Sequence, residues 1–399
     1  MKRYILEQGP VARRALLLIL VVGVPLLFMR NLLDAINVPK LGLLLMIVPL
    51  VAAIRVIELL QGADRSGLKR VALPAAAIAV PLTISWIFSP YKAWALFGNY
   101  SRFGGLISYL VVVAFGVLLA DAFAGRALTL ARALVGAGTI AAAYALLQFV
   151  GLDPFEWVLR GEIANRLTVS SFGNTNFAGG VFGIMVPLAV GLAAVERERR
   201  TLAIGAAAVI FLGLLVTVSQ GGLAAAAAGG AVTGGFILLP RWPKARLVGA
   251  LVASVVALAT VGAVLFTIVG PKPGPLPLTV ESRGEWWVIA AKMTADSPLV
   301  GRGPDVYALE GTLHRSREEA AGVGGFDFTD QPHNVALWFF ACAGALGGAG
   351  FLVAVGWGLK RGLELGDDQV LAGAFFGAVA AYFVQYLVSI DTVALRTVF

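Results

Sequence analysis

A histidine near the start of the last quarter of the chain has the residue type and the setting for acid–base chemistry. His333 is one of 2 histidines among 399 residues, and it lies in the sequence Gln331-Pro332-His333-Asn334, directly before a long apolar stretch. An imidazole with an ordinary pKa near 6.5 can accept a proton at neutral pH. Asn334 can cap the helix that the apolar stretch predicts. The alternative interpretation is that His333 merely satisfies a helix end at a membrane surface.

An arginine fifty residues upstream is the second candidate. Arg283 lies between Ser282 and Glu285, which have the spacing of a capping box, so we expect a helix to start at Ser282. Arg283 would then occupy the first helical position, where a guanidinium beside free backbone N–H groups can bind an anion. The alternative is that Arg283 only extends toward lipid phosphates.

The residues after Arg283 predict an amphipathic helix. Apolar residues recur there with helical spacing, at Trp286, Ile289, Ala290 and Met293. We expect this helix to lie on a membrane surface with its tryptophan at headgroup depth.

The elements that must position these residues are membrane helices. The chain is 59% hydrophobic and 14% charged, whereas a soluble domain has roughly 45–50% apolar and about 25% charged residues. Its mean hydropathy is +0.85. The single cysteine, Cys342, excludes an intrachain disulfide and a cysteine-built zinc site. The basic residues are scattered over short loops, so they indicate membrane orientation and no nucleic-acid partner.

We therefore predict an all-α polytopic membrane protein with about eleven transmembrane helices. A span needs about 20 mostly apolar residues, and the first is expected to be a span and not a cleaved signal peptide. The predicted spans are 15–29, 39–60, 71–88, 104–123, 130–150, 177–195, 201–218, 222–239, 247–270, 334–358 and 370–390. The residues after Asp391 resemble the start of a twelfth. Three regions result: helices 1–9 within 1–270, a long loop at 271–333, and the C-terminal helices within 334–399.

Lysine and arginine set the expected orientation. They gather in the loops that are cytoplasmic if the N-terminus is inside, among them those around Arg13, Arg65, Arg126, Arg199 and Arg361. Cytoplasmic loops of membrane proteins carry such an excess. The N-terminus is therefore predicted inside and the loop 271–333 outside, where Lys40, Arg102 and Arg166 are expected in short outer loops.

The order of several residues resembles the signature of the O-antigen ligase and polymerase superfamily. The similar residues are Arg283, Trp287, Ala290, Pro298, Gly301, Gly303, Tyr307, His333, Asn334 and Leu337. Upstream, Gly173-Asn174-Thr175-Asn176-Phe177 and Asn99–Leu106 resemble two further segments of the family. The resemblance covers roughly residues 85–390.

One position departs from this family's pattern. Many relatives have Ser-Arg-Gly in a short outer turn, with the arginine implied in binding the substrate diphosphate, but this chain has Ser219-Gln220-Gly221. Gln220 donates hydrogen bonds without carrying charge. Arg102, Arg166 and Arg302 are the candidates to replace the missing arginine; for Arg102 and Arg166, extension toward lipid is the alternative.

The resemblance implies a bacterial cytoplasmic (inner) membrane glycosyltransferase. It would move a glycan from a polyprenyl diphosphate to an acceptor hydroxyl on the outer face. From the residues we further expect direct displacement with inversion. We expect no metal or other cofactor, because Asp327 and Asp330 of the long loop lack partners for a metal site. His333 would be the base and Arg283 would stabilise the leaving group. The other residues assigned to substrate binding are Arg102, Arg166, Arg302, Gln220, Asn174, Asn176, Trp287 and Asn334. The acceptor stays open among lipid A core, a growing glycan and protein; a flippase or another transporter is the alternative function.

Overall fold

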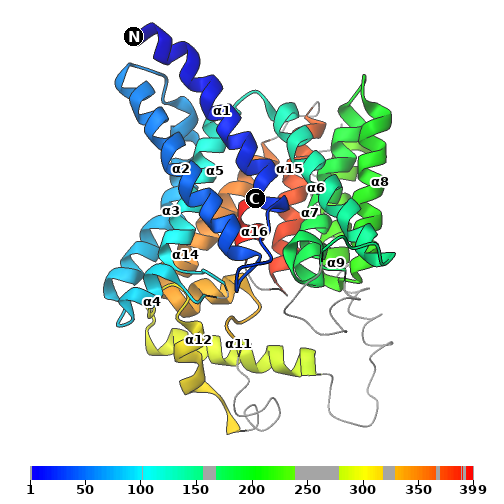
Figure 1. Ribbon diagram of the computed structural model, residues 1–399. Helices are drawn as coiled ribbons and strands as arrows, with labels where there is room; N and C mark the ends of the chain where they lie inside the picture. Colours follow the sequence, from blue (N-terminus) through cyan, green and yellow to red (C-terminus); the bar gives the residue numbers. More distant parts are fainter. Residues whose placement is uncertain are drawn as a thin grey trace.

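The computed structural model is helical throughout the part of the chain that it describes. It describes residues 2–100, 102–155, 168–238, 278–317, 329–364, 369–387, 389 and 392–398. All regular secondary structure in these residues is α-helix or short 3-10 helix (Figure 1). Helices satisfy their own backbone hydrogen bonds, which lipid requires of a spanning segment.

Eight of the described helices are long and apolar enough to cross a membrane. They are α1 (Lys2–Leu26), α2 (Asn37–Leu60), α3 (Ser66–Phe88), α6 (Ala127–Phe149), α7 (Thr175–Val195), α8 (Arg200–Thr217), α9 (Gln220–Leu238) and α14 (Val335–Leu363). Two shorter apolar helices, α5 (Leu106–Ala122) and α15 (Val370–Tyr386), lie where further spans are predicted. The expected span at 247–270 lies outside the described residues, so the total of eleven or twelve remains a prediction. The chain is a multi-pass membrane protein.

Small residues allow the helices around α7 to pack closely. α7 contacts α8, α9 and α15. A Cβ added at Gly183 would lie 2.3 Å from the carbonyl oxygen of Gly222 in α9, so only glycine permits this approach. Helices in lipid associate through such small residues. The hydrophobic effect does not drive their association there, so close van der Waals packing must do so.

Four charged side chains join α1, α2 and α5 at one end of the bundle. Arg13 binds Glu58 and Asp121, with its Nη2 and Nη1 3.0 and 2.9 Å from their carboxylates. Arg55 also binds both acids, with its Nη1 and Nε at 3.2 and 2.9 Å. Each side chain is at most 7% exposed. Each of these charges lies beside side chains of the opposite charge, which offsets part of the desolvation free energy of burying it.

The opposite end of the bundle, which the sequence predicts to be the outer region, carries the shorter helices. These are α4 (Lys92–Phe97), α11 (Leu278–Asp296), α12 (Tyr307–Glu310) and the 3-10 helices η2 (Ser170–Phe172) and η3 (Gly311–His314). In Figure 1, α11 lies across the ends of the long helices. Ile289, Ala290 and Met293 of α11 are at most 3% exposed, as the predicted apolar face requires.

The predicted start of α11 is wrong. The helix begins at Leu278, four residues before Ser282, so Arg283 lies in its second turn and not at its first position. The free N–H groups of the helix end are therefore not beside Arg283. The capping-box pattern was misleading because the residues before Ser282 also adopt helical conformation.

Lys40 is a second correction, because it does not lie in a loop. It occupies the first turn of α2, and its ammonium is fully buried. The Nζ donates to the carbonyl oxygens of Val24 and Leu27, each at 2.8 Å. These are carbonyls that the end of α1 leaves without helical partners. Lys40 therefore closes the end of α1.

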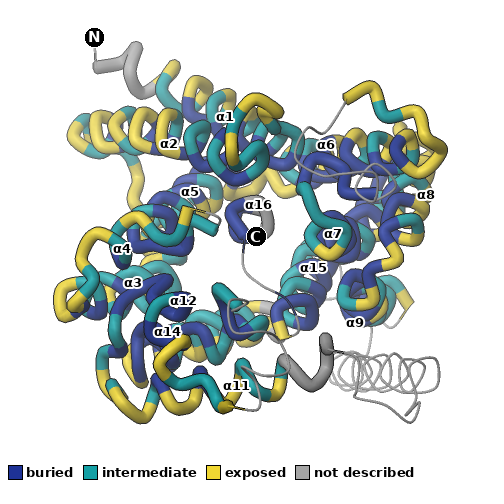
Figure 2. The backbone as a smooth tube through the Cα atoms, turned by 60° about the horizontal axis from the view of Figure 1, so that its bottom comes forward, coloured by how far each residue is buried: buried dark blue, intermediate teal, exposed yellow. Residues whose placement is uncertain are grey.

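The last described segment folds into the bundle. The residues that resemble the start of a twelfth span form the short helix α16 (Val393–Val398). It contacts α1, α2, α5 and α7, and Figure 2 shows it at the centre of the ring of helices.

Candidate functional site

His333 lies in the short segment that leads into α14, packed against an aromatic ring from α11. The imidazole stacks on the indole of Trp286, with ring centroids 4.6 Å apart and an interplanar angle of 27°. Burial, followed by the positive charges of Arg283 and Arg102, lowers the pKa of His333 to about 4. The imidazole is therefore neutral at pH 7 and has a free acceptor lone pair on one nitrogen.

Arg283 reaches this site from the second turn of α11. Its guanidinium is partly buried, and burial lowers its pKa from the ordinary value. Guanidinium groups nevertheless stay protonated in proteins. The site therefore holds a permanent positive charge next to a neutral imidazole.

Arg102 brings a second positive charge from the turn between α4 and α5. Its Nε lies 2.6 Å from Oδ2 of Asp330, three residues before His333. Its guanidinium carbon lies 5.6 Å from the ring centroid of Phe177, at the head of α7. Arg102 therefore connects the α4–α5 turn, α7 and the segment that carries His333.

A glycine-rich turn fixes α11 against α14. α14 is kinked at Gly344, whose φ is 63°. The amide of Ala345 donates to the Pro298 carbonyl at 2.7 Å, and the Gly303 amide donates to the Cys342 carbonyl at 2.9 Å. A Cβ at Gly301 would lie 2.2 Å from the Cys342 carbonyl oxygen. The turn therefore supplies partners for backbone groups that the kink exposes, and this fixes α11 relative to His333.

Asparagines cap α7 and α14, the helices that begin near the site. The side chain of Asn174 accepts from the amide of Asn176 at 2.8 Å and caps α7. Oδ1 of Asn334 accepts from the amide of Leu337 at 3.1 Å and caps α14, as predicted. Gln385, near the end of α15, donates to the Asn176 carbonyl at 3.3 Å. The asparagines thus hold backbone geometry, and their role toward a substrate stays a prediction.

The comparisons with known proteins agree with this arrangement. The family model described as O-antigen ligase matches residues 205–352, which include Arg283, the turn at Gly301 and His333. This match supports the resemblance of the chain to the O-antigen ligase superfamily. A comparison with curated proteins gave no match. This similarity indicates a glycosyltransferase-type membrane enzyme.

Not every predicted site residue lies at the cluster of His333, Arg283 and Arg102. Arg302 lies beside Tyr91 and Glu310, where Glu310 raises the pKa of the Tyr91 hydroxyl by hydrogen bonding and Arg302 lowers it. Gln220 is the exposed first residue of α9. Trp287 is 39% exposed, and the ring on His333 is that of Trp286. Arg166 lies outside the described residues.

Three side chains at the cluster were not among the predicted site residues. Trp286 was placed on the apolar face of its helix but was not assigned to the site. Asp330 was not assigned a role in the site, and Phe177 was considered only as part of a motif. The separation of Asp330 from His333 by three residues was the available signal, since both precede the same helix.

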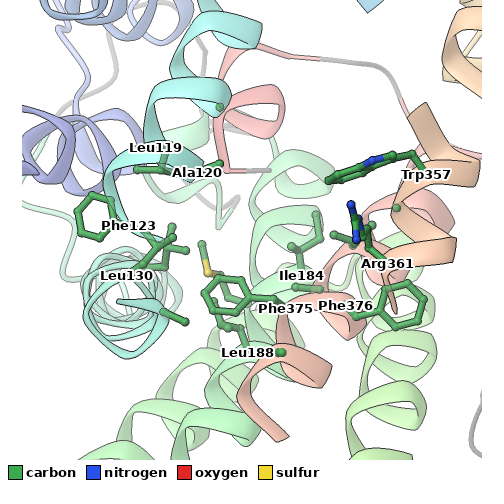
Figure 3. A pocket seen from close by; sticks show the side chains of 18 residues that line it. Leu119, Ala120, Phe123, Leu130, Ile184, Leu188, Trp357, Arg361, Phe375 and Phe376 are labelled. Atoms are coloured by element: carbon green, nitrogen blue, oxygen red, sulfur yellow. The ribbon is translucent and has the colours of Figure 1, made fainter. Parts of the chain in front are cut away.

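A cavity of about 460 Å³ lies toward the opposite end of the helix bundle from His333 (Figure 3). Leu119 and Phe123 line it, close to Asp121 of the buried ion cluster, and Trp357 and Arg361 lie at the far end of α14 from His333. Its walls are almost entirely apolar, so it suits hydrocarbon and not the reacting groups of a glycan. The cavity is therefore separate from the His333 cluster.

Proposed function

We propose that this protein transfers a glycan from a polyprenyl diphosphate to an acceptor hydroxyl at the outer face of the bacterial cytoplasmic membrane, with inversion and without a metal ion. The observation that carries the proposal is the neutral imidazole of His333 within the electrostatic reach of Arg283 and Arg102. His333 can accept a proton, while Arg283 and Arg102 can stabilise the negative charge of a leaving diphosphate. These are the two requirements of glycosyl transfer from a diphosphate.

In the proposed reaction the acceptor oxygen attacks the anomeric carbon directly. The bond from that carbon to the diphosphate oxygen breaks, and its electron pair leaves with the diphosphate. The hydroxyl proton passes to His333. A positioned base of this kind contributes typically about 10²–10⁴-fold to the rate.

The low pKa of His333 is compatible with a reaction in which the donor binds before the proton is transferred. In the free protein two guanidinium groups oppose a positive charge on the imidazole. A bound diphosphate would offset the charges of Arg283 and Arg102, so the pKa of His333 would rise, although burial, the larger cause of its lowering, would remain. The base would then become stronger when the donor is in place.

The arginines are proposed to hold the diphosphate and to stabilise it as it leaves. Guanidinium groups match phosphate oxygens with two parallel hydrogen bonds, and no acidic residue is needed to expel so good a leaving group. Arg102 is the best candidate for the arginine missing at Gln220, because it lies with His333 while Arg302 lies beside Glu310. Ligase and polymerase activities both fit this site, so the acceptor stays open.

The test is a transfer assay with protein reconstituted in vesicles and a polyprenyl-diphosphate-linked glycan as donor. We compare the native chain with His333→Ala and Arg283→Ala, all in EDTA. His314→Ala is the matched control, since His314 is the second histidine of the outer region and pairs with Asp296 at 3.3 Å instead of lying at the cluster. We expect loss of transfer in the first two variants and near-native transfer in His314→Ala.

Each alternative result has a distinct meaning. Native activity in His333→Ala or Arg283→Ala would show that the site is wrongly assigned. Loss of native transfer in EDTA, restored by a divalent cation, would overturn the metal-free mechanism. Absence of transfer by a folded native protein that moves the donor across the vesicle membrane would favour a transporter.

A further inference from the structure

The turn that carries Arg102 has a backbone conformation that contacts with other segments must stabilise. It connects α4 to α5, and the amides of Arg102 and Phe103 both donate to the Asn99 carbonyl oxygen, at 3.0 and 2.7 Å. Phe103 has a φ of 51°, in the left-handed region that a phenylalanine rarely adopts. Such conformations cost free energy and persist only where surrounding contacts hold them.

Asp305 holds the amide side of this turn. Its Oδ2 accepts from the amide of Asn99 at 2.7 Å and from the amide of Gly104 at 3.0 Å. The carboxylate is 1% exposed, and its residue has a φ of 61°. A Cβ at Gly104 would lie 2.4 Å from Oδ1, so glycine at this position leaves the space that the carboxylate fills.

Arg396 of α16 holds the carbonyl side of the same turn. Its Nη2 donates to the Arg102 carbonyl oxygen and its Nη1 to the Phe103 carbonyl oxygen, each at 3.2 Å. Nη1 also donates to the hydroxyl of Ser108 at 2.9 Å. The guanidinium carbon lies 4.7 Å from the ring centroid of Tyr109, and the residue is 5% exposed.

The two groups match the polarity of the turn. A carboxylate receives its N–H groups and a guanidinium binds its C=O groups, and hydrogen bonds with one charged partner are stronger than neutral ones. Burial raises the pKa of Asp305 to about 7, against the opposite effects of the Asn99 amide and Arg396. Asp305 and Arg396 come from segments about 200 and 290 residues away from the turn. Such distant partners converging on one turn indicate that its exact placement matters.

We propose that Asp305 and Arg396 are positioning residues, which hold the Arg102 turn so that the Arg102 guanidinium faces the donor diphosphate beside His333. The proposal rests on the function proposed above. Neither residue would touch the substrate. They would act on it through Arg102 alone.

The test is a double-mutant cycle on kcat/KM for the lipid-linked donor, with Asp305→Ala, Arg102→Ala and the double variant. Misplacing a binding group by about 1 Å can cost about 10²-fold. We expect Asp305→Ala to lower kcat/KM about 10- to 100-fold, mainly by raising KM. In the Arg102→Ala background, the same substitution should lower it less than about 2-fold, because the group that it positions is absent.

Conservative variants and a control separate positioning from folding. Asp305→Asn keeps an oxygen that can accept from both amides, so it should restore most of the loss. Asp296→Ala removes a 53% exposed carboxylate of the same outer region and should leave kcat/KM near native. If Asp305→Ala does not fold, Arg396→Lys provides the cycle, since lysine keeps the positive charge but cannot reproduce both guanidinium hydrogen bonds to the carbonyl oxygens of Arg102 and Phe103.

The outcomes distinguish this proposal from the proposed function. Equal losses from Asp305→Ala with and without Arg102, accompanied by a lower thermal midpoint, would overturn positioning while the glycosyltransferase function stands. Native kcat/KM in Arg102→Ala would overturn it too. Absence of transfer by the native protein would instead remove the proposed function on which the inference rests.

Discussion

At the scale of single residues, the imidazole of His333 takes its properties from the side chains around it. The indole of Trp286 covers one face, and two guanidinium groups oppose a positive charge. The Arg102 guanidinium is itself paired with Asp330. These neighbours keep the imidazole neutral over a wider pH range than an exposed histidine would be.

This environment predicts the pH dependence of the proposed reaction. Protonation removes the base, and the pKa of His333 is about 4, so kcat/KM should stay level from pH 7 to about pH 5 and fall as the pH approaches 4. In Arg283→Gln one opposing charge is gone, so the falling limb should move to higher pH, although the maximal rate is lower. The measurement is kcat/KM for the donor between pH 4 and 8. A native limb near pH 6.5 would contradict the prediction.

At the scale of elements, close helix contacts determine where the site residues lie. The kink of α14 at Gly344 receives the Pro298–Gly303 turn, and the head of α7 packs near α15. α9 packs against α7 and α15 through its own glycines. A side chain added at one of these contacts would separate the helices.

Two adjacent glycines of α9 allow a matched test of this packing. A Cβ at Gly229 would lie 2.5 Å from the Gly377 carbonyl oxygen, whereas a Cβ at Gly230 would have nothing within 4 Å among the described residues. Overpacking typically costs about 1–3 kcal/mol, while alanine in an open helical position stabilises. Gly229→Ala should therefore lower the thermal midpoint in detergent, and Gly230→Ala should keep or raise it. Equal midpoints for the two variants would show that α9 packs differently.

At the scale of the whole molecule, two chemically different ends face away from each other. One end carries the buried cluster of Arg13, Arg55, Glu58 and Asp121. The other carries α4, α11 and α12 (Figure 1). The His333 cluster lies with α11, since the imidazole stacks on Trp286 of that helix. The excess of lysine and arginine in the loops predicts that the first end is cytoplasmic.

Cysteine labelling tests this orientation. Leu313 is 74% exposed in η3, and Ser66 is exposed at the start of α3 near the opposite end. The native Cys342 is fully buried and should contribute little background. In intact cells an impermeant thiol reagent should label Leu313→Cys and not Ser66→Cys. The reverse pattern would invert the topology and place the His333 cluster in the cytoplasm.

The sequence by itself determined the long apolar helices of this protein and the cap of α14 at Asn334. Long apolar stretches must form helices in lipid, because a spanning backbone can satisfy its hydrogen bonds only within itself. The break between α8 and α9, the cap at Asn334 and the apolar face of α11 follow from spacing of a few residues, and all three were predicted. The resemblance to the O-antigen ligase superfamily was likewise visible in the order of Arg283, Gly301 and His333.

Only the tertiary structure decided which charged groups meet at His333. Arg102 and Arg302 are equally suitable as residue types, but Arg102 lies with His333 while Arg302 lies beside Glu310. Asp305 and Arg396 reach the Arg102 turn from segments far away along the chain. Such contacts depend on how helices pack, and packing depends on side-chain volumes and glycine contacts across many helices at once. The spacing of residues along the chain does not determine which distant side chains come together. The set of residues around His333 could therefore be read only from the tertiary structure.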